Sequence, residues 1–297
     1  MAARSTRETR LWVLLARKSD VALILRRGPS KQVLAIRWHR KDDTFYLGQW
    51  LKGRIYEHRC DLSPSGDLLL YFAASHKGPY RSWSALSRPP FLTALALWPK
   101  GDCWGGGGRF ESEREFSLNH LPHQTSLAET FQLPKRFTVA PIQGTPGCVF
   151  DHDSSLTRDG WNLVEPGEFS GMLKMKSPRI WSKLQPKGGR VQLQLSFVKF
   201  AGTRDVRPVT VAAVVDAKSI LLDLGPIDWV DWDRNGDLLH SNGGCIYRSK
   251  FRGNRLEEPV SLLDTAGYKF RELKPSKEAV TWNQPLRLQS LCEFSEI

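Results

Sequence analysis

A short strand–turn–strand module recurs along this chain, and it constrains the fold more than any other feature of the sequence. In the clearest copy, a strand at residues 53–56 is followed by a tight turn at 63–67 and an apolar run at 68–72. Such a run is too short for a helix and is typical of a buried strand. The copy therefore predicts two strands joined by a turn.

Two further copies follow at irregular spacing. Residues 235–239 lead into a strand at 244–248, and a degenerate copy at 99–104 runs into four glycines at 105–108. The turn glycines of the three copies are 35 and 135 residues apart, so intervening copies must have diverged. Repetition of one small β module favours a propeller over a single sandwich or barrel.

The rest of the chain reads as short strands between Gly-, Pro- and Ser-containing turns, and 11 Trp, 24 Gly and 18 Pro fit that organisation. Residues 111–135 are polar and aperiodic, which predicts a non-strand insertion with a short helix at 126–131. Residues 166–189 are also expected to be loop. Strands are expected at residues 11–16, 21–26, 32–39, 82–86, 91–97, 137–140, 147–150, 161–164, 191–200, 209–215, 219–224, 260–263 and 270–273.

These strands predict an all-β chain that is more than half strand, with residues 1–297 forming one domain. The architecture expected is an irregular β-propeller of about five to seven blades.

The module resembles the blades of bacterial β-propellers and WD-repeat-like proteins, where a turn of the S-P-x-G-x type joins neighbouring strands. Residues 63–67 and 233–237 carry this likeness. Residues 48–72 and 87–108 also look like bacterial proteins of unassigned function. The resemblance implies a propeller fold but no particular activity, because propellers host many functions.

Cellular location is expected to be cytoplasmic. No run approaches the roughly 18 apolar residues that span a bilayer, and the apolar stretch at 11–16 is too short for a secretory signal. Five scattered cysteines without a C-x-x-C pair suggest free thiols in a reducing compartment.

Positive charge is concentrated at one end of the chain. Residues 1–59 carry 14 Lys/Arg against 5 Asp/Glu, a net charge of +9 out of +12. Such an asymmetry indicates either an anionic partner or a solvated basic face.

Basic and aromatic residues also gather between residues 38 and 88. On a strand, Arg54 and Tyr56 share one face, opposite Gly53 and Ile55. Cations beside flat rings suit anionic, planar or single-stranded nucleic-acid partners. The alternative is that the rings pack between blades while the charges lie at the rim. The predicted partner-binding residues are Trp38, His39, Arg40, Trp50, Lys52, Arg54, Tyr56, Arg59 and Arg88.

Asp231, Asp233 and Asn235 form the best metal candidate, because alternate oxygen-bearing residues before a glycine can wrap a calcium ion. The segment looks like the first half of an EF-hand loop. However, Asn242 stands where the bidentate Glu belongs, and the sister turns have one carboxylate each. The interpretation favoured is a turn without a metal, and no cofactor is expected.

Other motifs lack the context that chemistry requires. The glycines at 105–108 are not followed by G-K-[ST], so a close backbone approach is favoured over phosphate binding. His120 and His123 are separated by Pro122, and the run 151–153 lacks a third ligand at helical spacing. His39, Asp42, Asp43 and Cys60 are residue types that hydrolases use, but their spacing does not require catalysis.

The sequence therefore favours a non-catalytic binding or scaffold module for a protein or other macromolecular partner, without a membrane. A hydrolase with its site in the propeller channel is one alternative. Nucleic-acid binding through the basic N-terminal third is another.

Overall fold

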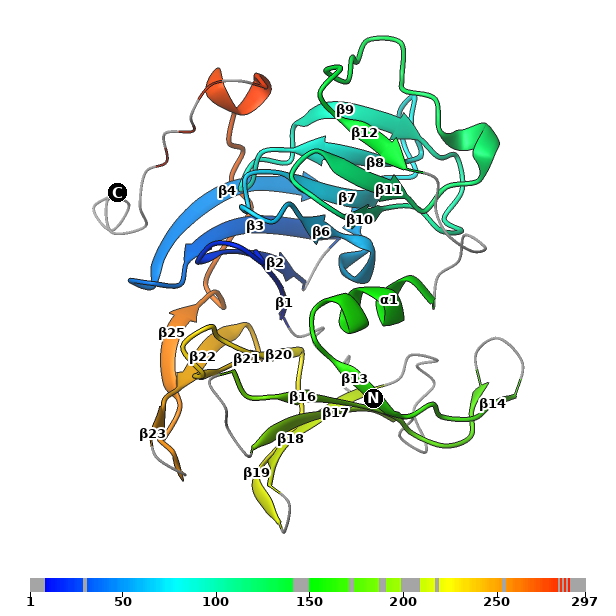
Figure 1. Cartoon of the computed structure of the whole chain (residues 1–297). Helices are drawn as coiled ribbons and strands as arrows, with labels where there is room; N and C mark the ends of the chain where they lie inside the picture. The colour runs from blue at the N-terminus through cyan, green and yellow to red at the C-terminus, as the bar shows by residue number, and fades with distance from the viewer. Residues whose placement is uncertain are drawn as a thin grey trace, which may run out of the picture. The chain divides into compact units, whose positions relative to one another are not determined.

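The structure is a computed structural model that describes residues 9–28, 31–140, 150–170, 174–186, 191–198, 209–216, 219–252, 255–282, 284, 286 and 288. It is all-β, as predicted, with 47% strand and 6% helix, so the strand share lies just below the half that was expected (Figure 1). Each sheet formed by the described strands is open.

The chain packs as two compact units. Unit 1 comprises residues 1–155 and 268–297, and unit 2 comprises residues 156–267. Each unit has its own buried apolar cluster. The prediction of one domain over residues 1–297 stays a prediction.

Unit 1 begins with a four-stranded antiparallel sheet, called sheet A here, whose strands follow chain order. Alternation along these strands sends Leu23, Leu25 and Val33 into one core. Sheet A consists of β1 (Arg10–Leu15), β2 (Val21–Arg27), β3 (Gln32–His39) and β4 (Thr44–Lys52).

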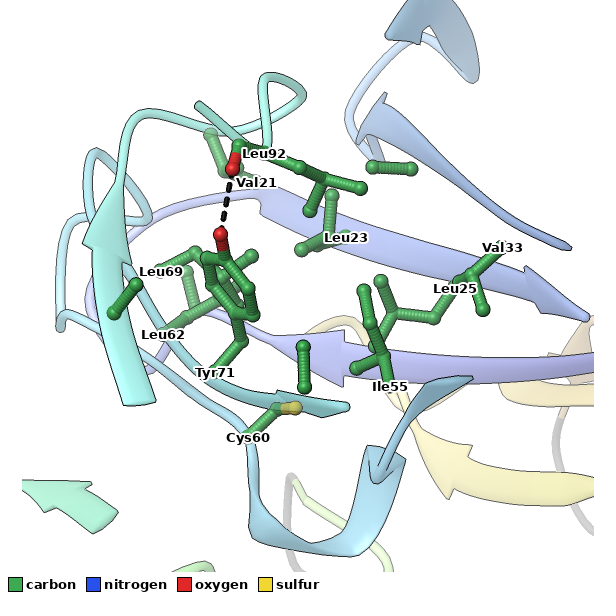
Figure 2. Close-up of a cluster of buried hydrophobic side chains, with 14 residues drawn as sticks. Val21, Leu23, Leu25, Val33, Ile55, Cys60, Leu62, Leu69, Tyr71 and Leu92 are labelled. Carbon is green, nitrogen blue, oxygen red and sulfur yellow. Dashed lines mark hydrogen bonds between the residues drawn. The ribbon is translucent and has the colours of Figure 1, made fainter. Parts of the chain in front are cut away.

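A second antiparallel sheet closes over the same core, as Figure 2 shows. Its Tyr71 is buried, and the phenol donates a hydrogen bond of 2.6 Å to the carbonyl oxygen of Leu92, which satisfies the one polar atom of that side chain. The sheet consists of β5 (Arg54–Ile55), β6 (Asp61–Leu62), β7 (Leu69–Ala74), β8 (Ser82–Ser87) and β9 (Ala94–Pro99), with the 3-10 helix η1 (Glu57–Arg59) between β5 and β6.

A third, smaller sheet completes the strands of unit 1. It contains β10 (Gly108–Phe110), β11 (Glu115–Leu118) and β12 (Thr138–Ala140), and Trp98, Phe110 and Phe116 form its buried cluster. The helix predicted at 126–131 is wrong: that segment has no regular structure apart from a turn at 129–130, and the short helix is η2 (Pro122–Gln124) instead. β11 also shows that the region 111–135 is not wholly free of strand.

Unit 2 is built from two larger sheets and two short hairpins. Its core includes Trp181, Leu193 and Trp232. One sheet has the order β13 (Asn162–Glu165), β16 (Arg179–Leu184), β17 (Gln192–Val198), β18 (Val209–Val215) and β19 (Ile220–Pro226). The other has the order β20 (Trp229–Trp232), β21 (Leu238–Asn242), β22 (Cys245–Ser249) and β25 (Val260–Asp264). The hairpins are β14 (Phe169–Ser170) with β15 (Lys174–Met175), and β23 (Phe251–Arg252) with β24 (Arg255–Leu256).

Helices are few. The α-helix α1 (Phe150–Arg158) lies where the two units meet in sequence, and the 3-10 helix η3 (Glu278–Val280) follows the last strand. The strand predicted at 147–150 falls mostly outside the described residues, and its last residue begins α1 instead. The strand predicted at 270–273 is wrong, since residues 268–276 have no regular structure. Among the described residues, no helix is long and apolar enough to cross a membrane.

Two copies of the repeated module share one turn geometry. The amide of Gly66 donates to the carbonyl of Ser63 at 2.8 Å, and the amide of Gly236 donates to that of Asp233 at 2.9 Å. Both glycines have positive φ angles, 81° and 89°, which glycine adopts at little cost. The third copy differs, because β9 pairs with β8 while β10 pairs with β11, so its turn does not close a hairpin.

Candidate binding site

Two of the predicted binding residues are buried within unit 1. Trp38 is 0% exposed, stacks on Phe45, and donates its indole N–H to Asp43 over 3.0 Å. Arg40 is 4% exposed and donates to the carbonyl of Ser19 at 2.9 Å. Because a partner cannot reach them, these side chains support sheet A and are not part of an accessible site.

His39 and Arg88 also have internal partners. His39 Nε2 accepts a hydrogen bond of 3.4 Å from the buried Arg37, and burial together with that nearby cation lowers the pKa of His39. Arg88 donates to the backbone carbonyls of Glu278 and Thr281 at 2.8 and 3.2 Å. His39 therefore has its partner on its own strand, β3, whereas Arg88 joins residues far apart in the sequence of unit 1.

The remaining residues form two clusters. The tyrosine cluster contains Arg54, Tyr56 and Arg59 with Phe72. The tryptophan cluster contains Arg26, Trp50 and Lys52 with Phe270.

The clusters belong to different sheets. Arg26 and Trp50 lie on the face of sheet A opposite its core residue Leu25, whereas Phe72 of the tyrosine cluster alternates with the core residue Tyr71 on the second sheet. Arg26 lies over the Trp50 ring at 5.4 Å, whereas its neighbour Arg27 bonds Glu57 beside the tyrosine cluster at 3.3 Å. Successive residues of a strand point to opposite faces. The basic charge near this end of the sheet is therefore divided between two surfaces.

In the tyrosine cluster, two guanidinium groups approach one phenol ring. The guanidinium carbons of Arg54 and Arg59 lie 4.3 and 4.8 Å from the centroid of Tyr56, and Ile55 between them is buried. The expectation that Arg54 and Tyr56 share a face agrees with this contact. Tyr56 also lies 5.0 Å from the Phe72 ring. Cation–π contacts of this kind hold the cations at the surface without neutralising them.

Arg59 connects this cluster to the glycine run. Its Nη1 donates to the carbonyl of Cys103 at 3.0 Å and to that of Gly105. The run then packs so closely that side chains cannot be added: a Cβ atom at Gly106 would lie 2.3 Å from the Phe72 ring. The prediction of a close backbone approach at 105–108 is confirmed.

The loop that Arg59 binds presents an exposed indole. Trp104 is 67% exposed, and its amide donates to Asp102 at 2.8 Å. Burial opposes ionisation of Asp102, but hydrogen bonds from Lys100 and Gln124 outweigh it and lower the pKa of this carboxyl. These hydrogen bonds therefore fix the backbone of the loop that carries Trp104 beside the tyrosine cluster.

A buried polar chain supports the same loop. The amide of Gly107 donates to Ser84 Oγ at 2.7 Å, and this hydroxyl lies 2.7 Å from His120 Nε2. His120 Nδ1 lies 2.8 Å from the carbonyl of Gln124. Since a carbonyl only accepts, Nδ1 carries the proton, and Ser84 donates to Nε2.

This serine–histidine contact has the connectivity of a hydrolase pair. However, Ser84 and His120 are both buried and the serine is 0% exposed, so its hydroxyl does not face a substrate in this structure. Its evident role is to anchor Gly107.

The acidic turn in unit 2 is occupied by cationic side chains. Arg248 Nη1 lies 2.7 Å from Asp233 and 3.0 Å from Asp237, while Lys183 lies 2.7 Å from Asp231. Burial raises the pKa of Asp231 despite this lysine. Asn235 donates to Asp237 at 2.8 Å and accepts from its amide. Within the described part of the chain, no group of three or more His, Cys, Asp or Glu side chains is arranged to hold a metal ion.

Several residues of these clusters were missed from the sequence. Arg26 and Phe270 are separated by most of the chain, and Phe72 was interpreted only as a strand residue. Trp104 was interpreted only as the end of a degenerate module copy, although its position between an Asp turn and four glycines is a signal for an exposed loop. No protein-family model matches the sequence, and no curated protein matches it significantly.

Proposed function

We propose that this chain is a non-catalytic binding module for a protein partner with an acidic surface. The observation that carries the proposal is Trp104, 67% exposed on a loop bound by Arg59 beside the tyrosine cluster. Exposed tryptophans surrounded by basic groups are typical of the residues that dominate protein interfaces.

The fixed conformation of the Trp104 loop favours binding, because the entropy lost when a flexible loop becomes ordered reduces affinity. A loop whose backbone is already fixed before binding loses less conformational freedom when the partner arrives. Three anchors fix this loop: Arg59 on its carbonyls, Ser84 on the amide of Gly107, and Lys100 on Asp102. An indole held in this way can fill an apolar pocket while Arg54 faces an acidic rim.

The basic groups of the tyrosine cluster favour an acidic partner over a neutral one. Arg54 and Arg59 both approach the Tyr56 ring, and Glu57 is the acidic residue that the same short helix contributes. Glu57 is paired with Arg27 and also attracts Arg54, but one carboxylate among three arginines leaves the surface positively charged. A complementary partner would steer toward this surface and bind less well as salt rises.

An array of synthetic peptides tests the proposal. Peptides that vary in net charge and aromatic content are titrated against the full chain at low and high salt, with a single-stranded oligonucleotide alongside. Acidic peptides containing an aromatic residue should bind best, and Trp104→Ala should weaken them by about tenfold or more, as for interface anchors.

Val260→Ala is the control, because Val260 is also exposed, at 62%, but lies in unit 2. Equal binding by the Trp104→Ala and Val260→Ala chains would overturn the assignment of the site. Binding of the oligonucleotide alone would replace the protein partner with nucleic acid, and binding of neither would remove the function.

We further propose that the chain is a single-domain, cytoplasmic β-propeller of about five to seven blades, similar to bacterial WD-repeat-like proteins. The support is that several sheets are antiparallel meanders in chain order, such as β1-β2-β3-β4 and β16-β17-β18-β19. A crystal structure with these sheets around one axis would agree with the proposal, and sheets stacked as a sandwich would contradict it.

A further inference from the structure

Residues 268–282, called the C-terminal segment here, pack against the rest of unit 1 through two aromatic side chains. Its Phe270 ring lies 5.9 Å from the Trp50 ring, and Lys52 Nζ lies 4.4 Å from the centre of the Phe270 ring. Further along, Trp282 packs on Phe137 at 5.0 Å. In Figure 1 the orange segment after β25 is the one that carries these contacts past β4.

The side chain of Gln49 is held in the orientation in which it donates a hydrogen bond to the backbone of this segment. Its Oε1 accepts three hydrogen bonds of 2.8–2.9 Å, from the amides of Leu92 and Thr93 and from the hydroxyl of Thr93. These fix the amide group so that Nε2 donates to the carbonyl of Leu273 at 3.0 Å. Gln49 is 8% exposed, so this is a built polar contact in the body of unit 1.

Arg88 binds the segment in the same manner. It donates to the carbonyls of Glu278, Thr281 and Gln284. Both Gln49 and Arg88 therefore recognise main-chain carbonyls, which every peptide has. In such recognition the main chain supplies affinity and side-chain contacts supply specificity. The contact that supplies specificity here is made by the Phe270 ring, which lies against both Trp50 and Lys52.

Around Phe270 the segment is poorly matched in charge to the surface that it covers, although Glu278 further along attracts Arg88. Lys269 and Arg271 flank Phe270, next to the basic Lys52, and all three cations are exposed. Like charges brought together in this way reduce affinity. Residues 268–276 also lack regular structure, and Leu273 remains 38% exposed, so this first part of the segment buries little of its own surface, whereas Ala279 further along is buried. Segments with few buried contacts open at low free-energy cost.

We propose that Gln49, Trp50, Lys52 and Arg88 form a peptide-binding surface, and that residues 268–282 are its built-in competitor. The ligand that this surface fits is an extended segment of a protein partner, with an aromatic residue flanked by acidic residues three positions before the carbonyl that Gln49 binds. Acidic flanks complement Lys52, which the chain's own segment does not. The surface is separate from the Trp104 site, and this inference does not depend on that one.

The experiment uses the full chain and a labelled synthetic peptide with the sequence of residues 268–284, measured by fluorescence anisotropy. In the wild-type chain the tethered segment competes at an effective concentration on the order of millimolar. Phe270→Ala in the chain removes its aromatic anchor, so the peptide should bind that chain about tenfold more tightly than the wild type. A second peptide with Glu at positions 269 and 271 should bind more tightly than the native sequence to both chains.

A variant that strengthens binding of the chain's own segment distinguishes release of the segment from damage to the fold. Arg271→Glu in the chain improves the charge match with Lys52, so it should weaken binding of the added peptide relative to the wild type. Lys274→Glu makes the same charge change at an exposed position outside the aromatic contact, and it should have the smaller effect.

Two results would overturn the inference. One is equal binding of the peptide by the wild-type, Phe270→Ala and Arg271→Glu chains. The other is undiminished binding of a peptide in which Phe270 is replaced by Ala.

Discussion

A Cβ atom placed on Gly107 would lie 1.9 Å from the carbonyl oxygen of Arg59. No relaxation of a flexible side chain can relieve that contact, because the atom it meets belongs to the backbone. The approach is what allows Arg59 to reach the carbonyls of Cys103 and Gly105 with its guanidinium group. The glycine run and the arginine are thus one structural unit, and Trp104 lies within it.

The first prediction is that Gly107→Ala destabilises the protein strongly. Gly107 has a φ of +79° and no room for a methyl group. Overpacking and left-handed strain each cost about 1–3 kcal/mol, so the expected loss is about 3 kcal/mol in urea unfolding.

Gly101→Ala is the matched control. Its φ is +82° but nothing lies within 4 Å of the added atom, so only the backbone strain applies. A loss for Gly107→Ala no larger than that of Gly101→Ala would show that the close approach is not as described.

The second prediction concerns Arg248. Its side chain is 7% exposed and bonds two carboxylates that are also mostly buried. Arg248→Met should cost about 3–5 kcal/mol, because breaking a buried ion pair leaves uncompensated charge. Adding Asp233→Asn and Asp237→Asn should restore part of the loss in the same unfolding assay. If the additional substitutions lower stability further, the carboxylates have another role.

The third prediction is that calcium does not stabilise this turn. Arg248 lies between the two carboxylates that a cation would use, and Asn242 lacks the bidentate carboxylate of a calcium loop. Melting temperatures of the wild type and Asp233→Ala should each be the same in calcium and in chelator. A calcium-dependent rise of several degrees in the wild type, absent from the variant, would establish a metal site.

The fourth prediction concerns pH. Burial lowers the pKa of His120, although its hydrogen bond to Gln124 acts in the opposite direction. The unfolded chain therefore binds a proton that the folded chain does not, and stability should fall as pH drops below about 6.5.

His120→Gln removes this titration and can still accept from Ser84. Its loss of stability between pH 7 and pH 5 should be smaller than that of the wild type by about 1 kcal/mol. Parallel stability curves for the two proteins, measured by urea unfolding at each pH, would show that His120 does not titrate in this range.

Three of the four strands of sheet A could be predicted from the sequence because each is a continuous apolar run between turn residues. The fourth, β4, was missed because Gly48 and Gln49 interrupt its apolar residues. The run at 32–39 coincides with β3, and 209–215 coincides with β18. β16 was missed because its polar and apolar residues, RIWSKL, do not alternate with the period of two that marks a strand, and they lie inside a stretch rich in Pro and Gly. α1 was missed because Phe150 and Leu156 are the two apolar residues of its nine, too few for a helical pattern to stand out in the sequence.

The binding clusters were only partly predictable. The contact of Arg54 with Tyr56 follows from strand alternation and is local in sequence. The position of Phe270 on Trp50 depends on where the chain returns after unit 2, which no local pattern specifies. Burial of Trp38 and Arg40 likewise depends on the turns beside them, since their partners are Asp43 and Ser19.

The last prediction concerns the net charge of +9 in residues 1–59. Arg26, Arg37 and Arg40 are buried, so reversing them would damage the fold and would not test binding. Among the described residues up to 52, the exposed cations divide between the two ends of sheet A: Arg10, Lys31 and Lys52 at one, and Lys18 and Lys41 at the other.

Positive charge divided between the two ends of a sheet raises the local electrostatic potential less than the same charge on one continuous face. Single-stranded DNA should therefore bind weakly at low salt. With at most about three phosphates neutralised, the slope of log K against log salt should be no steeper than about −2. Arg10→Glu, Lys31→Glu and Lys52→Glu together should abolish this binding, whereas Lys18→Glu with Lys41→Glu should reduce it less. A titration of the wild type and the two variants with single-stranded DNA at two salt concentrations checks this prediction. A slope of log K against log salt steeper than about −5 would mean that the cations form one continuous phosphate-binding face.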